Sequence, residues 1–216
     1  MTRHFHHELE ALKGRVVAMG GLARENVLDA VHALLELDQE RAKKVIARED
    51  QLNRMDVEIE RDILDLLALN QPVAQDLRTA GASLKIITYV DRIGRYGYDV
   101  AKVVRKMEGA QHIRKPVAFL PMAEAGMRML DAALEAYRDR DAAKARSVPP
   151  LDEVVDGLYD QVFRDCVTHM MEDPRTISLS AHYILVARHL ERVADHANKI
   201  AEKALYMVTG ERRLQV

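Results

Sequence analysis

Residues 88–101 read TYVDRIGRYGYDVA, and residues 188–201 read RHLERVADHANKIA. The two stretches align without a gap at an offset of 100 residues, which sets Asp91 against Glu191. The same offset also matches acidic positions on an earlier segment of each copy. A match that extends to a second segment makes chance similarity between two amphipathic helices the weaker explanation. The sequence therefore predicts two copies of one unit, which together fill nearly the whole chain.

Each copy is predicted to form three helices. Apolar residues recur with a helical period, and no segment sustains the alternation of apolar and polar residues that marks a half-buried strand. Prolines end helices because they lack the backbone N–H and restrict the residue before them. The fold class is therefore all-α, with six long helices in two tandem units. The predicted helices span residues 5–37, 40–69 and 74–107 in the first copy, and about 122–138, 151–171 and 175–208 in the second.

Local signals set the boundaries within the chain. Asp38 precedes the second predicted helix, and its short carboxylate is suited to accept backbone N–H groups as an N-cap. The segment 111–121 carries two prolines and is the natural linker. We therefore predict a first repeat at residues 1–110, the linker at 111–121, and a second repeat at residues 122–216.

The composition limits the classes of protein that fit. No tryptophan occurs and aromatic residues make up 5%, which disfavours a β-sandwich or barrel. Thirty-two basic residues face 34 acidic ones, for a net charge of −2, which argues against a nucleic-acid-binding domain. Cys166 is the single cysteine, so an internal disulfide and a cysteine-rich zinc site are impossible. Without an apolar span or a signal-peptide core, we expect a cytoplasmic protein.

Acidic residues are paired four positions apart on the predicted helices. Side chains at this spacing lie on one helix face, where two carboxylates repel each other. On a helical wheel, Glu191 and Asp195 lie away from the apolar stripe, on an outer or flanking face. A single pair of this kind is common on a solvated face, and either nearby arginines or a bound cation would relieve its repulsion. The pairs are Asp56/Glu60, Asp156/Asp160 and Glu191/Asp195.

The duplication changes the interpretation of the second repeat. If its last two helices are antiparallel neighbours, the pair Asp156/Asp160 faces the pair Glu191/Asp195. Four carboxylates would then converge, and such an all-oxygen cluster suits hard cations such as Mg²⁺, Mn²⁺, Ca²⁺ or Fe³⁺. The sequence therefore predicts a metal site in the second repeat.

The first repeat is a weaker candidate for metal. Asp91 would join the pair Asp56/Glu60, but the position that matches Asp195 is occupied by Arg95. Arginine is permanently charged. Because Arg95 lies one turn from Asp91, it can neutralise this cluster by ion pairing. We therefore expect metal more in the second repeat than in the first.

Three histidines recur every seven residues in the last predicted helix, at His182, His189 and His196. On the same wheel their stripe lies roughly opposite the acidic pair, which makes them poor co-ligands for it. We expect them to be interface or edge-of-core residues.

Several segments resemble the PhoU family of phosphate-uptake regulators. In the first repeat these are residues 75–78 (QDLR), 84–86 (LKI) and 91–94 (DRIG). In the second they are residues 170–176 (MMEDPRT) and 191–195 (ERVAD). The resemblance runs in order through both repeats and covers nearly the whole chain.

This resemblance implies two three-helix bundles that carry E/D-x-x-x-D motifs and bind multinuclear metal clusters. Iron, magnesium, manganese, calcium and zinc are the candidate metals. It further implies a non-enzymatic, cytoplasmic negative regulator that contacts a phosphate ABC transporter and a phosphate-responsive sensor histidine kinase. Such a protein would be a homodimer and at most peripheral to the membrane. The matching motifs are Asp56/Glu60, Asp156/Asp160 and Glu191/Asp195, and the fourth, Asp91/Arg95, is broken.

Two alternatives remain open from the sequence. One is a carboxylate-bridged metal oxidase of ferritin-like type, although such sites use Glu-x-x-His pairs and none occurs in this chain. The other is a metal-free helical scaffold whose acidic residues are merely solvated.

Overall fold

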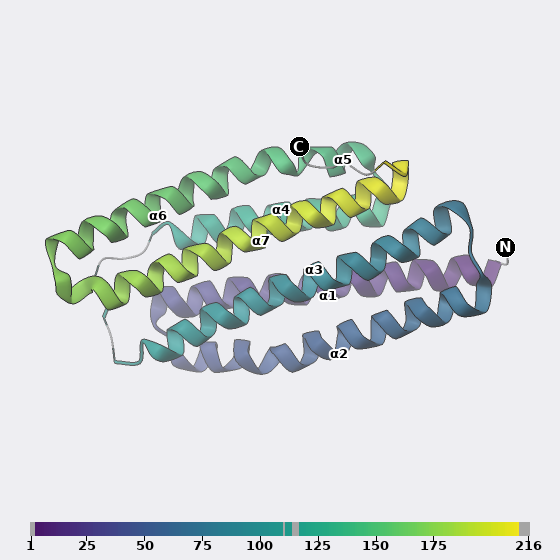
Figure 1. The fold of residues 1–216 in the computed structure, drawn as a ribbon. Helices are drawn as coiled ribbons and strands as arrows, with labels where there is room; N and C mark the ends of the chain where they lie inside the picture. The colour runs from purple at the N-terminus through teal and green to yellow at the C-terminus, as the bar shows by residue number, and fades with distance from the viewer. Residues whose placement is uncertain (1–2, 110, 114–116, 212–216) are drawn as a thin grey trace.

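The computed structural model describes residues 3–109, 111–113 and 117–211, and the regular structure of this part is entirely helical (Figure 1). The predicted all-α fold of two three-helix repeats is confirmed. The first repeat consists of α1 (Arg3–Glu36), α2 (Gln39–Asn70) and α3 (Ala74–Lys106). The second contains α4 (Phe119–Asp139), α6 (Asp152–Glu172) and α7 (Ile177–Thr209), with the short α5 (Ala142–Ser147), η1 (Pro149–Leu151) and η2 (Pro174–Thr176) between them.

The long helices lie side by side and share one apolar core. Figure 1 shows α6, α7, α3 and α2 in succession across the molecule, with α4 and α1 behind them. Within the repeats, α3 packs on α1 and α2, and α7 packs on α4 and α6. Between the repeats, α3 packs on α7 and α1 packs on α4. The buried apolar side chains therefore form one continuous cluster through both repeats.

The helix ends follow local chemistry. Asp38 caps α2 as predicted, since its Oδ1 accepts hydrogen bonds from two backbone N–H groups at 3.0 and 2.9 Å. Helix α4 begins at Phe119, inside the predicted linker 111–121. This is possible because Pro121 falls in the first turn, where a missing N–H breaks no helical hydrogen bond.

Helices α1 and α3 approach each other closely at Gly97. A Cβ atom at Gly97 would lie 2.8 Å from the backbone carbonyl carbon of Asn26 and 2.9 Å from the backbone nitrogen of Val27. One turn away, the buried Asn26 side chain donates from Nδ2 to the carbonyl oxygen of Gly94 at 3.2 Å. A buried side chain bonded to the backbone of its neighbour fixes the register of the two helices, because a shift would leave the amide without this partner.

Aromatic and imidazole rings fill the contact between α3 and α7. Tyr96 of α3 lies against His189 and His196 of α7, with ring centroids 5.8 and 5.5 Å apart. Burial lowers the pKa of both histidines. The prediction of interface histidines is therefore confirmed at these two positions.

Replacing Gly97 with alanine is expected to destabilise the protein by about 1–3 kcal/mol, because the added methyl group would force the backbones of α1 and α3 apart. Gly81→Ala on the same helix is the matched control, since a Cβ there meets no atom within 4 Å. That control should gain up to about 1 kcal/mol from helix propensity. Urea unfolding monitored by circular dichroism measures both free energies, and equal stability of the two variants would contradict the close approach.

Candidate functional site

Acidic side chains of α6 and α7 lie close enough in the second repeat to influence one another's pKa. Burial raises the pKa of Glu191, and the charges of Asp195 and Asp156 raise it further. Since Asp156 belongs to α6 and the other two to α7, the carboxylates interact across the helix pair. Three of the four predicted residues of this repeat, Asp156, Glu191 and Asp195, are thus electrostatically coupled.

Asp152 is a member of this cluster that the sequence analysis missed. Burial raises its pKa to about 6, and the nearby carboxylates of Asp156 and Asp195 raise it as well. Asn198 of α7 donates from Nδ2 to Asp152 Oδ2 at 2.7 Å, which opposes this rise. The sequence could have indicated that Asp152 belongs to the cluster, because Asp152 lies one helical turn before Asp156, on the same face of the helix.

Asp160 differs from Asp156 in its effect on the cluster. Asp156 and Asp160 are both exposed on α6, and within the described residues neither forms a hydrogen bond or ion pair with the cluster. They differ in that the charge of Asp156 raises the pKa of Asp152 and of Glu191. Asp152 and Asp156 are thus the α6 residues coupled to the carboxylates of α7, and the metal-binding role of the pair Asp156/Asp160 stays a prediction.

Arginines neutralise part of the charge on α7. Arg188 Nη1 lies 2.6 Å from Glu191 Oε1, and Arg192 Nη1 lies 3.4 Å from Asp195 Oδ2. The second oxygen of Glu191 is buried without a hydrogen-bond partner, and Arg192 Nε is 3.9 Å away. The Oδ1 atom of Asn198 is likewise buried and unpartnered. The cluster thus holds oxygen atoms whose bonding capacity the protein itself does not use.

The donor set fits a hard cation, because it consists of carboxylate and amide oxygens. In the part of the chain that the structure describes, however, no three histidine, cysteine, aspartate or glutamate side chains already converge in a cation-binding arrangement. The carboxylates of α7 point instead toward their arginines. A cation here would be held by rotated side chains of Asp152, Asp156, Glu191 and Asp195.

The first repeat has a smaller acidic cluster. Burial raises the pKa of Asp56, and Asp91 and Glu60 raise it further. One oxygen of Asp56 is buried without a hydrogen-bond partner. Glu60 is exposed at the edge of this group. Asp56 of α2 and Asp91 of α3 therefore form the buried part of the cluster.

Arg95 acts on the first-repeat cluster through its charge, while the ion pair it forms among the described residues is with Glu49. Burial raises the pKa of Asp91, while Arg95, followed by Arg92, lowers it. Arg95 Nη2 also lies 3.8 Å from Glu49 Oε1, so the guanidinium is shared between two acidic groups. A permanent cation thus occupies the side of the cluster where the second repeat has Asp195.

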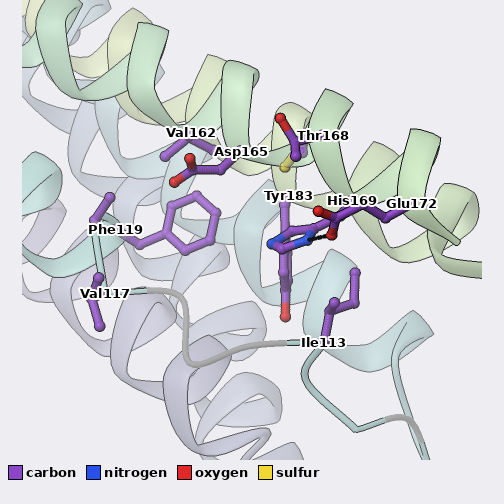
Figure 2. A pocket seen from close by; sticks show the side chains of 11 residues that line it. Ile113, Val117, Phe119, Val162, Asp165, Thr168, His169, Glu172 and Tyr183 are labelled. Carbon is purple, nitrogen blue, oxygen red and sulfur yellow. Dashed lines mark ion pairs between the residues drawn. The ribbon is translucent and has the colours of Figure 1, made fainter.

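A cavity of about 290 Å³ lies beside these helices, at the end of α6 and the start of α7 and α4. Figure 2 shows His169 and Glu172 paired in this cavity, with Nδ1 and Oε2 3.7 Å apart. Cys166 also lines it, but burial raises the pKa of this thiol to about 11. This is the opposite of the shift that activates a nucleophilic cysteine. Cys166, His169 and Glu172 are therefore not arranged for covalent catalysis.

None of the described helices is long and apolar enough to cross a bilayer.

Comparisons with known proteins agree with the repeat structure. The PhoU domain family model matches residues 16–104 and again residues 119–204. A phosphate-specific transport system accessory protein PhoU homolog from Rhizobium meliloti is 38% identical over 95% of this chain and 87% of its own length. The homolog from Clostridium acetobutylicum is 32% identical over 98% of this chain and 97% of its own length.

Solved structures show the same arrangement of helices. The crystal structure of PhoU from Pseudomonas aeruginosa has a TM-score of 0.90 and 38% identity, and the comparison covers 96% of this chain and 100% of that one. The phosphate transport system regulatory protein PhoU from Streptococcus pneumoniae has a TM-score of 0.89 and 28% identity, with 98% of this chain and 100% of that one covered. On these matches, which span both repeats, the chain belongs to the PhoU family.

Proposed function

We propose that this protein is a non-enzymatic regulator of phosphate uptake, which acts with a phosphate ABC transporter and a phosphate-responsive sensor histidine kinase. The observation that carries this proposal is the match to phosphate-specific transport system accessory proteins over almost the full length of this chain. The Streptococcus pneumoniae protein of the same fold is described as regulatory. We further propose that the protein acts in the cytoplasm, as a homodimer.

The fold is suited to binding partners rather than to catalysis. Its long helices present extended surfaces to partner helices (Figure 1). The one cysteine in the larger cavity has a raised pKa, which makes its thiol a poor nucleophile. The remaining candidate function is cation binding by the acidic clusters.

We propose that the second repeat binds a hard cation through Asp152, Asp156, Glu191 and Asp195, with Asn198 as a neighbouring oxygen donor. The first repeat would bind metal more weakly, through Asp56, Asp91 and Glu60, because Arg95 already supplies positive charge there. A bound cation would neutralise carboxylates whose pKa values are raised by burial and mutual repulsion. Its role would be to hold α6 and α7 in one arrangement.

The double variant Asp156→Asn/Glu191→Gln is expected to lose metal binding in the second repeat. Wild-type protein stripped by chelation should gain stability on addition of Mn²⁺, by about 2.7 kcal/mol at a free concentration 100 times the dissociation constant. The double variant should gain much less. Asp160→Asn is the control on the same helix, since the charge of Asp156, and not that of Asp160, acts on Asp152 and Glu191.

Thermal unfolding with and without Mn²⁺, together with elemental analysis, measures these effects. Full metal content in the double variant would contradict the assignment. Loss of metal in Asp160→Asn alone would show that α6 contributes the pair Asp156/Asp160 after all.

Deletion of the gene is expected to raise alkaline phosphatase activity in cells grown at high phosphate, because starvation signalling would no longer be repressed. Complementation with wild-type protein should restore repression. Complementation with Asp156→Asn/Glu191→Gln tests whether repression needs the acidic cluster, and Asp160→Asn again serves as control. Unchanged phosphatase activity in the deletion strain would count against the proposed function.

The metal-free scaffold remains a second candidate, because Arg188 and Arg192 already pair with the acidic residues of α7. It makes the opposite prediction for the chelation experiment. Under this alternative, Mn²⁺ changes neither the unfolding temperature nor the elemental content of the wild-type protein.

A further inference from the structure

A separate cavity lies between the first turns of α3 and the last turns of α7. Its volume is about 270 Å³. The side chains of Arg78 and Lys85 come from α3, and those of Lys203 and Tyr206 come from α7. The cavity therefore spans the contact between the two repeats, at the end of the molecule where the yellow end of α7 meets the start of α3 (Figure 1).

Among the described residues, the lining of this cavity carries three cations, Arg78, Lys85 and Lys203, and no carboxylate. Within the described residues, none of the three forms an ion pair. Elsewhere on the molecule cations find acidic partners; Arg24 pairs with Asp131 and Arg48 with Asp29. Like charges gathered in a concave site raise the local positive potential and favour an anion there.

Arg78 is held in place by the end of α7. Its Nε donates to the carbonyl oxygen of Met207 at 3.5 Å, and its Cζ would lie 3.8 Å from a Cβ atom at Gly210. The two terminal nitrogens make no hydrogen bond within the described part of the chain. With Nε bonded in this way, the N–H groups of Nη1 and Nη2 remain as donors. They can bind two oxygens of one phosphate group at the same time.

Small residues leave room between the charges. Arg78 and Lys85 lie two helical turns apart on one face of α3, and Gly81 lies between them. A Cβ atom at Gly81 would meet nothing within 4 Å, so no side chain fills the space. One water molecule takes about 30 Å³ in the liquid. The cavity of about 270 Å³ is several times larger, so it has room for a phosphate group and for more of a ligand. Leu77, half exposed at the rim, offers an apolar contact for the remainder of a ligand.

We propose that this cavity binds a phosphate group, with Arg78 as the bidentate donor and Lys85 and Lys203 as flanking charges. The group belongs either to a free phosphate compound or to an anionic lipid headgroup. The proposal goes beyond the regulatory function and the metal site, because it depends only on the charges and the space between α3 and α7.

Isothermal titration of the full chain with inorganic phosphate tests the first source. A chelator in the buffer removes metal as an alternative site, and salt at about 0.15 M screens weak surface attraction. Saturable binding is expected for the wild-type protein, with at least tenfold weaker affinity in Lys85→Gln/Lys203→Gln. Lys44→Gln removes an exposed, unpaired lysine of α2 outside the cavity and should bind like the wild type.

Flotation with phosphatidylcholine vesicles, with and without phosphatidylglycerol, tests the second source. Binding that needs phosphatidylglycerol and is lost in Lys85→Gln/Lys203→Gln supports the site with a lipid as the source. Circular dichroism melts establish that the double variant is folded. The two lysine substitutions do not alter the contact between Arg78 and α7. The proposal is overturned if neither probe binds, or if the double variant and Lys44→Gln bind equally well.

Discussion

The packing of α3 against α7 joins the two repeats, and the remaining helices are arranged around this pair. Each of the two helices also forms the central element of its own bundle. The rings of Tyr96, His189 and His196 fill the contact between them. Because α3 and α7 carry the matching sequences of the duplication, the contact is one between equivalent helices. Each acidic cluster then lies on the outer side of this pair, between α3 and α2 or between α7 and α6.

The duplication explains the difference between the two clusters. Equivalent backbone positions hold Asp91 and Glu191 in both repeats, so the geometry of the two sites starts out alike. Arg95 stands where the second repeat has Asp195, which changes the charge by two units at that position, and Leu52 stands where the second repeat has Asp152. In the first repeat the arginine lowers the pKa of Asp91. In the second repeat another carboxylate raises the pKa of Glu191. Both clusters have arginines nearby, Arg95 in the first repeat and Arg188 and Arg192 in the second, but the second repeat gathers more carboxylates.

The helical architecture was predictable from the sequence. Helical periodicity and prolines are read from neighbouring residues, and the internal repeat is read by comparing two segments of the chain. Asp38 shows this well, since its capping role follows from its own position before a helix. Helix α4 begins three residues before the predicted start near 122, because a proline in the first turn of a helix is compatible with it.

The membership of the acidic cluster was less predictable. Asp152, Asp156 and Asp160 follow one another at the same spacing, and sequence alone does not say which two lie opposite α7. That choice depends on how far α6 and α7 slide along each other, which is a property of tertiary packing. The cavity between α3 and α7 was not predicted either, because its cations come from different repeats, more than 100 residues apart in sequence, and meet only in the folded molecule.

Helix α7 runs without interruption from Ile177 to Thr209. Glu191 and Lys203 are twelve positions apart on it, so the acidic cluster and the basic cavity are separated by about 18 Å along one stiff rod. Because α7 is one continuous helix, a change of its tilt at one end also moves its other end. A cation bound at the acidic cluster and a phosphate group bound in the basic cavity would therefore both contact the same helix.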